Sequence, residues 1–156
     1  MSRVAQLKRL VGAAIGVAAI IVLCGCENPR VGPLAIQVQE SDLVVTVCAP
    51  ISATRLWFEE KGSDWGGDWR TFWKEDVRLA LDAGDQISTN PAVTSLAEGG
   101  DRSTPQLSPG NRIDIEVKGA TGKASQLAAQ FTIPESGLSS SSWLHPDGSM
   151  TAEACP

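Results

Sequence analysis

Apolar and polar residues alternate along much of this chain, and this pattern constrains the fold more than any other feature. The clearest case is residues 113–118, where Ile113, Ile115 and Val117 alternate with charged residues. A period of two places apolar side chains on one face of a β-strand and polar side chains on the other. No long stretch beyond residue 33 has the apolar spacing of an amphipathic helix. The pattern therefore predicts an all-β domain.

Turn residues separate the alternating segments at short intervals, as in a β-sandwich. We expect strands at 34–39, 43–48, 54–59, 77–81, 86–88, 113–118 and 126–133, and a hairpin around Pro-Asp-Gly within 143–151. Residues 89–110 are rich in Pro, Gly, Ser and Thr and predict a long irregular loop. A loop of that length either carries function or hides a missed element.

The first 23 residues have the features of an export signal. Arg3, Lys8 and Arg9 precede the stretch LVGAAIGVAAIIVL at 10–23, which is fourteen residues long and has no charge. That stretch is shorter than the roughly 20 residues needed to span a bilayer. It has the length of the apolar region of a signal peptide, and we expect that region to be helical.

The sequence Leu23-Cys24-Gly25-Cys26 follows this apolar stretch and resembles the lipobox of bacterial lipoproteins. The resemblance implies cleavage after Gly25 and attachment of a lipid to the Cys26 thiol. The protein would then be lipid-anchored at the extracytoplasmic face of the cell membrane. A secreted protein cut nearby and an uncleaved short anchor are the alternatives. The expected organisation is a signal peptide at 1–25, a tether at 26–33 and a β-sandwich at 34–156.

Charge narrows the classes of partner. The chain has 13 Lys and Arg against 18 Asp and Glu, a net charge of −5. Removal of Arg3, Lys8 and Arg9 with the signal leaves 10 against 18, or −8. Nucleic acid selects basic surfaces, so it is not an expected partner. An anionic membrane surface would repel the domain as a whole, so membrane attachment is expected through the lipid on Cys26.

Two cysteines, Cys48 and Cys155, remain for pairing once Cys24 leaves with the signal and Cys26 carries lipid. In an exported domain two cysteines predict one disulfide, and two free thiols are the alternative. A metal site would need more ligands than Cys48, Cys155 and His145 provide, so neither a metal nor another cofactor is expected.

Two further resemblances concern the domain. Cys48 on one strand with Trp57 on the next is similar to the immunoglobulin-like pattern, although the spacing is short and the second Cys is terminal. The resemblance implies an immunoglobulin-like antiparallel β-sandwich in architecture only. With its lipobox, the LVVTVC segment at 43–48 and the WLHPDG segment at 143–148, the whole chain resembles small lipoproteins of actinobacteria. This second resemblance implies no activity.

The most distinctive segment is 62–73, GSDWGGDWRTFW, which we call the Trp-rich loop. Its tryptophans are spaced four apart, and that spacing places them on one side of either a helix or a strand. Indole faces beside carboxylates suit sugars, and an arginine can hold an anionic group. The alternatives are a structural loop that folds its indoles over one end of the sandwich, and a protein contact. The candidate ligand-binding residues are Trp65, Trp69, Trp73, Asp64, Asp68 and Arg70.

Other polar groups give only weak indications of a metal site or a catalytic site. Asp64, Asp68, Glu75 and Asp76 are close in sequence, but their spacing is not that of a calcium-binding loop. His145 follows a run of serines at 139–142, yet a tail turn is a poor platform for a catalytic triad.

We therefore expect no catalytic residues and no enzyme activity. The expected function is a non-enzymatic binding or scaffolding role in the cell envelope, with an envelope protein or a glycan as partner. The alternative is carbohydrate, cell-wall or small-ligand binding through the Trp-rich loop.

Processing can be tested directly. Cys26→Ser removes the thiol that would carry lipid, so the variant should accumulate as the unprocessed precursor and take up no labelled fatty acid. Metabolic labelling followed by gel electrophoresis checks both. A variant that is still cut after Gly25 and still labelled would contradict the lipoprotein interpretation.

Overall fold

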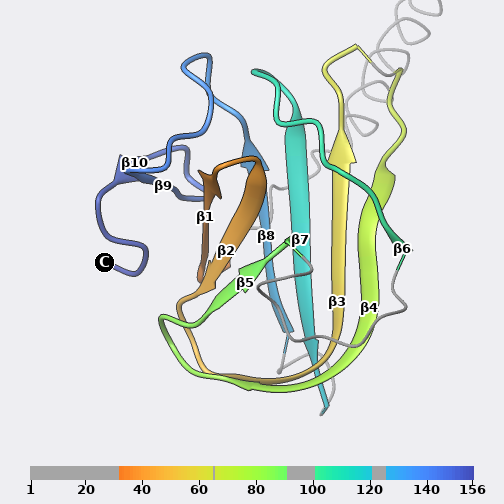
Figure 1. Ribbon diagram of the computed structural model, residues 1–156, viewed down its shortest axis with the longest axis vertical. Coiled ribbons are helices and arrows are strands. Elements are labelled where there is room, and N and C mark those ends of the chain that lie inside the picture. The colour runs from red at the N-terminus through yellow and green to blue at the C-terminus, as the bar shows by residue number, and fades with distance from the viewer. Residues whose placement is uncertain (1–31, 65, 91–100, 121–125) are drawn as a thin grey trace, which may run out of the picture.

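The domain is a β-sandwich in which two antiparallel sheets pack face to face (Figure 1). The computed structural model describes residues 32–64, 66–90, 101–120 and 126–156. The predicted signal peptide and nearly all of the predicted tether lie outside these ranges. Within them, no helix is long and apolar enough to cross a membrane. The predicted all-β sandwich is confirmed.

Within the described ranges, each sheet has five strands. Sheet A has the order β10-β9-β1-β2-β5, from β1 (Leu34–Gln39), β2 (Asp42–Val47), β5 (Gln86–Ser88), β9 (Trp143–Leu144) and β10 (Met150–Thr151). Sheet B has the order β6-β4-β3-β7-β8, from β3 (Ile51–Lys61), β4 (Arg70–Leu81), β6 (Asp101–Arg102), β7 (Arg112–Gly119) and β8 (Gln126–Thr132). All pairings between these strands are antiparallel, and β1 and β2 align residue by residue from Leu34↔Val47 to Gln39↔Asp42.

The core lies between the sheets and is built from the apolar half of each alternating segment. Ile113, Ile115 and Val117 of β7 are completely buried, as the period of two predicts. They face apolar residues of β2 such as Leu43 and Val45 across the sandwich, in one continuous cluster. Full burial of each such side chain stabilises the fold by about 1.5–3 kcal/mol.

Strand β4 is longer than the sequence predicts. The alternation predicts a strand from Val77, whereas β4 begins at Arg70 and takes in the end of the Trp-rich loop. Two aromatic residues of this extension pack edge-on against Phe58, with ring centroids 6.0 Å away for Phe72 and 5.0 Å away for Trp73. A register shift between Phe58 and Glu59 lets both consecutive residues point into the core.

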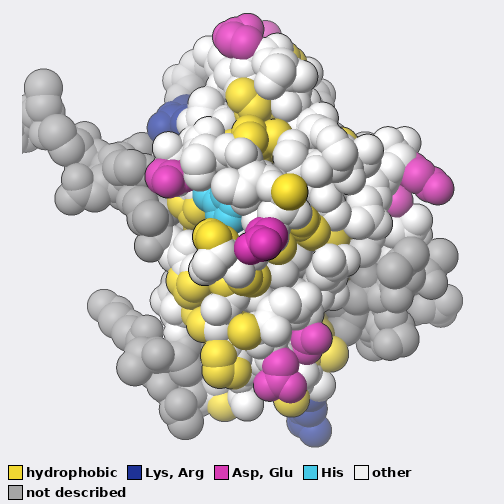
Figure 2. Space-filling view, turned by 90° about the vertical axis from the view of Figure 1, so that its left-hand side faces the viewer, with side chains coloured by type: hydrophobic (Ala, Val, Ile, Leu, Met, Phe, Trp, Pro, Cys, Tyr) yellow, Lys and Arg dark blue, Asp and Glu magenta, His cyan; other side chains and the backbone are white. Residues whose placement is uncertain are grey.

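The C-terminal tail, residues 143–156, covers part of the outer face of sheet A. Trp143 packs with Ala35 and Val44 in a second, small apolar cluster, and Ala154 joins its margin. A Cys48–Cys155 disulfide ties the tail to the end of β2, which confirms the predicted pairing. Figure 2 views this side of the molecule, where hydrophobic side chains gather between polar and backbone atoms.

The disulfide departs from the immunoglobulin pattern. In immunoglobulin domains it joins the two sheets and packs against a buried Trp. Here it joins sheet A to the tail, and Trp57 lies on the opposite, outer face of sheet B. The resemblance therefore extends to the sandwich architecture and not to this hallmark.

Removal of the disulfide should be costly. Cys48 and Cys155 are 107 residues apart, so the double variant Cys48→Ser/Cys155→Ser frees a long loop in the unfolded chain. We expect a loss of about 2–5 kcal/mol of unfolding free energy. Chemical denaturation followed by circular dichroism measures it, with reduced wild type as the matched control. An unchanged midpoint would show that the tail is held without the disulfide.

Candidate functional site

The outer face of sheet B, which we call the open face, is a broad polar surface. Its side chains come from alternate positions of β3, β4, β7 and β8, whose other positions fill the core. The central strand contributes Arg55, Trp57, Glu59 and Lys61, all partly exposed. An indole at the centre of a charged sheet face is the feature that marks this surface as a candidate site.

Trp57 is held between two lysines from the strands on either side. Lys74 Nζ lies 4.9 Å from the ring centroid, and Lys118 Nζ lies 5.1 Å from it. The indole Nε1 donates to Thr71 Oγ1 at 3.3 Å, and that hydroxyl donates to Glu59 at 3.1 Å. Cation–π contacts at exposed sites contribute about 0.5–1 kcal/mol each. Together these contacts orient the ring on the sheet.

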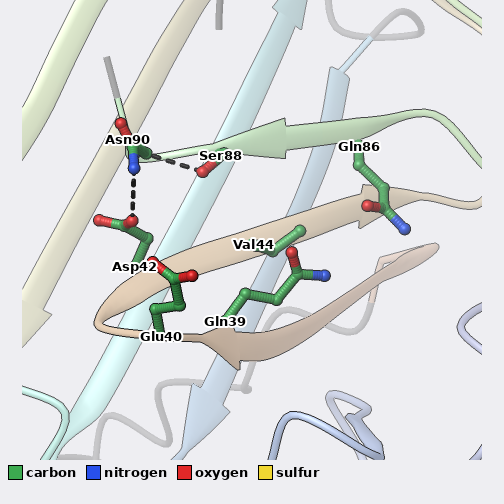
Figure 3. A pocket seen from close by; sticks show the side chains of 7 residues that line it. All are labelled: Gln39, Glu40, Asp42, Val44, Gln86, Ser88 and Asn90. Atoms are coloured by element: carbon green, nitrogen blue, oxygen red, sulfur yellow. Dashed lines mark hydrogen bonds between the residues drawn. The ribbon is translucent and has the colours of Figure 1, made fainter. Parts of the chain in front are cut away.

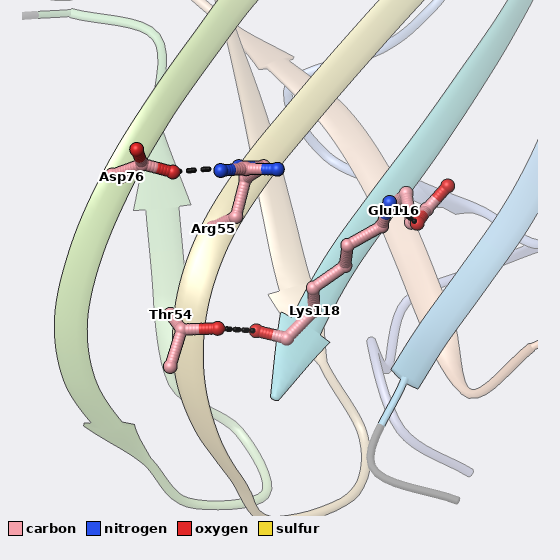
Figure 4. A network of polar contacts seen from close by, with 5 residues as sticks. All are labelled: Thr54, Arg55, Asp76, Glu116 and Lys118. Carbon is pink, nitrogen blue, oxygen red and sulfur yellow. Dashed lines mark hydrogen bonds and ion pairs between the residues drawn. The ribbon is translucent and has the colours of Figure 1, made fainter. Parts of the chain in front are cut away.

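Ion pairs continue the network beside Trp57 (Figure 4). Arg55 Nε donates to Asp76 at 2.6 Å, and Lys118 Nζ lies 2.9 Å from Glu116. The hydrogen bond from Arg55 lowers the pKa of Asp76 below its usual range, and that of Arg55 is raised in return. Both partners are exposed, so this pair arranges charge on the face more than it stabilises the fold.

A second aromatic cluster lies at one end of the open face. The Trp69 ring is 5.9 Å from Lys61 Nζ and 5.5 Å from the Arg112 guanidinium. Lys61 and Arg112 are opposite each other in the β3–β7 register. Trp57 and Trp69 therefore share one arrangement, in which a partly exposed indole has two cations close to its ring.

The structure separates the three tryptophans of the Trp-rich loop. Trp65 lies outside the described residues, and Trp69 is partly exposed. Trp73 is 1% exposed and belongs to the core, where its Nε1 donates to Glu75. The prediction that three indoles form one exposed surface is therefore wrong. The reason is the register shift in β4, which turns residue 73 inward.

The remaining predicted ligand residues of this loop have different surroundings. Asp64 and Asp68 are exposed, and their role in binding stays a prediction. Arg70 forms an ion pair with Glu60, whose side chain is completely buried. Glu60 also accepts a hydrogen bond from the backbone of Gln106 at 2.5 Å. Arg70 is thus engaged with a carboxylate of β3 that also holds the backbone of Gln106.

The other polar groups singled out by sequence have structural contacts. Glu75 is buried and paired with Arg102 at 2.6 Å, whose guanidinium also lies over the Trp73 ring. His145 Nε2 is 2.7 Å from Thr151 Oγ1 and joins the two strands of the tail hairpin. Within the described ranges, no group of three or more His, Cys, Asp or Glu side chains is arranged to hold a metal ion.

A shallow polar groove of about 230 Å³ lies where the β1–β2 turn meets β5 (Figure 3). Glu40 and Asp42 line it together with the amides of Gln39 and Gln86. Asn90 Nδ2 donates to Asp42 at 2.8 Å. The sequence contains no signal for this groove, because its two sides are more than 40 residues apart in the chain.

Comparison of the chain with protein-family models, curated proteins and solved structures finds no significant match. The function of this protein is therefore inferred from its own geometry. The open face has two oriented indoles among many charges, whereas the groove at the β1–β2 turn has polar groups and no aromatic ring. The open face is the stronger candidate.

The different positions of Trp69 and Trp73 predict different effects on stability. Trp73→Ala removes a buried ring and should cost about 3–5 kcal/mol of unfolding free energy. Trp69→Ala removes cation–π contacts at the surface and should cost less than about 1.5 kcal/mol. Denaturant unfolding of both variants, followed by far-ultraviolet circular dichroism, compares them. Equal losses would contradict this assignment of core and surface.

Proposed function

We propose that this protein is a lipid-anchored, extracytoplasmic envelope protein with a non-enzymatic binding or scaffolding role, and that the open face is its contact surface. The observation that most directly supports this proposal is the difference between the outer faces of the two sheets. The tail covers part of sheet A from outside, while the outer side chains of sheet B point away from the molecule. Contact with a partner is therefore favoured on sheet B.

The composition of the open face supports this assignment. Aromatic and arginine side chains are enriched where proteins bind partners, and aromatic rings bury large areas with little loss of side-chain freedom. Trp57 and Trp69 are already oriented by neighbouring cations. An oriented side chain loses less entropy on binding, which favours affinity.

The path of the chain near the anchor also fits an envelope role. Residues 26–33 reach at most about 29 Å when fully extended, at about 3.6 Å per residue. Gly32 lies directly against β8, since a Cβ built there would be 2.1 Å from the Ala128 carbonyl oxygen. The chain therefore leaves the domain beside the edge of sheet B. An anchor on Cys26 would keep the domain close to the membrane.

Carbohydrate or cell-wall binding through the Trp-rich loop is the second candidate. It is favoured by the partial exposure of Trp69 and by the exposed carboxylates of Asp64 and Asp68. With Trp73 in the core, the surface available to this candidate is smaller than the sequence predicts.

Site-specific photocrosslinking in intact cells tests the contact surface. A photoreactive residue at Arg78 or Thr132, both exposed on sheet B, should crosslink to an envelope component. The same residue at Met150 or Ala152 of the tail is the matched control and should not.

A second substitution separates the two candidates. Trp57→Ala in the Arg78 and Thr132 probe variants should reduce the crosslink several-fold with a stability loss of about 1 kcal/mol. Crosslinks that occur at the tail positions instead would refute the open face as the contact surface. Loss with Trp69→Ala but not with Trp57→Ala would favour the Trp-rich loop.

A further inference from the structure

We infer that the open face binds an anionic polysaccharide, a chain of sugars that carries carboxylate or phosphate groups. This inference builds on the proposed function and names the chemical class of the partner. It rests on how charge is divided between the two sides of the molecule and on what lies beside each indole.

The basic residues of the described chain are concentrated on the open face. Six of the eight point outward there: Arg55, Lys61, Lys74, Arg78, Arg112 and Lys118. The other two, Arg70 and Arg102, are paired with the buried carboxylates of Glu60 and Glu75.

The acidic residues are distributed in the opposite way. Of sixteen in the described chain, four lie at outward positions of the same strands: Glu59, Asp76, Asp114 and Glu116. Asp101 of β6 is in register with Lys74 at the margin of the face, and eleven lie elsewhere. The outward positions of the four long strands thus have a net charge of +2 in a described chain of −8. On the tail side, Figure 2 shows acidic side chains spread over the surface and basic ones only at its margins.

This separation orients a negatively charged partner. The acidic remainder of the domain repels an anion, and the open face attracts it, so electrostatics favours approach from one side. The open face does not attract anions uniformly, because the carboxylates of Glu59 and Glu116 lie among its cations. Carboxylates accept hydrogen bonds from hydroxyl groups. A ligand that carries both anions and hydroxyls satisfies both kinds of group.

The spacing of the aromatic clusters favours a polymer. Trp57 and Lys61 are four residues apart on β3, or about 13 Å at about 3.3 Å per residue. Lys61 belongs to the Trp69 cluster, so the two indole–cation clusters follow one another along the strand. A single sugar is too small to contact both, whereas several linked sugars can. A membrane surface is a less suitable partner, because its closely spaced phosphates would also be repelled by the four carboxylates of the open face.

Binding of defined polymers to the full chain in neutral detergent micelles tests the inference. Polygalacturonate is the anionic polysaccharide probe, dextran is the uncharged polysaccharide, and poly-L-glutamate is the polyanion without hydroxyls. Polygalacturonate should bind at least tenfold more tightly than the other two. Its affinity should fall steeply between 0.05 and 0.5 M salt, because salt screens exposed charges.

Matched charge variants locate the site. Lys74→Gln/Lys118→Gln removes two positive charges beside Trp57 and should weaken polygalacturonate binding about tenfold. Met150→Glu/Ala152→Glu adds two negative charges at exposed positions of the tail, so it changes net charge equally. This control should alter affinity less than twofold. Circular dichroism establishes that each variant is folded.

Each other outcome overturns the inference. No binding of polygalacturonate, equal binding of dextran, or equal weakening in both charge variants would refute it. Equal binding of poly-L-glutamate would show that charge alone is recognised. Displacement of polygalacturonate by phosphatidylglycerol vesicles at matched anion concentration would assign the face to anionic lipid. A different result is that polygalacturonate does not bind while the sheet B crosslinks persist and depend on Trp57. That result would reject an anionic polysaccharide as the ligand and leave the proposed contact surface in place.

Discussion

The attachment of the C-terminal tail to sheet A is the constraint on which the functional surface depends. Strands β9 and β10 have two residues each and are too short to hold a tail by backbone pairing alone. The Cys48–Cys155 disulfide and the packing of Trp143 on Ala35 and Val44 supply the remaining restraint. Because the tail covers apolar side chains on that side, sheet B is left as the sheet whose outer face is open.

A second constraint acts within sheet B. The register shift opposite Phe58 allows Phe72 and Trp73 to enter the core together, which removes one indole from the surface. The same region buries Glu60 and Glu75, whose charges are compensated by Arg70 and Arg102. A buried carboxylate without its cation would be strongly destabilising. Through these contacts β3 and β4 hold residues 102–106 beside the sheet. The outward cations of the sheet are not needed to compensate these buried charges.

The distribution of charge over the fold permits an anionic partner that the net charge alone would disfavour. The described residues have a net charge of −8 and are repelled by anionic surfaces on average. The fold nevertheless gathers most of its described basic residues on one sheet face around Trp57 and Trp69. Because exposed charges interact over about 8 Å at physiological salt, a partner at close range meets the local face and not the average.

The strands are a local property of the sequence, because a period of two depends only on neighbouring residues. The apolar residues of segment 113–118, for example, are buried as predicted. The disulfide followed from counting the cysteines that would remain after the predicted export, and it is present in the structure. The sequence did not predict which tryptophans are exposed and which are buried, because their equal spacing does not reveal the bulge opposite Phe58. The pairing of Trp57 with Lys74 and Lys118 joins three strands, and the groove beside Asp42 joins β2 to β5. Only the tertiary structure decides such contacts, because they depend on which strands become neighbours and in which register.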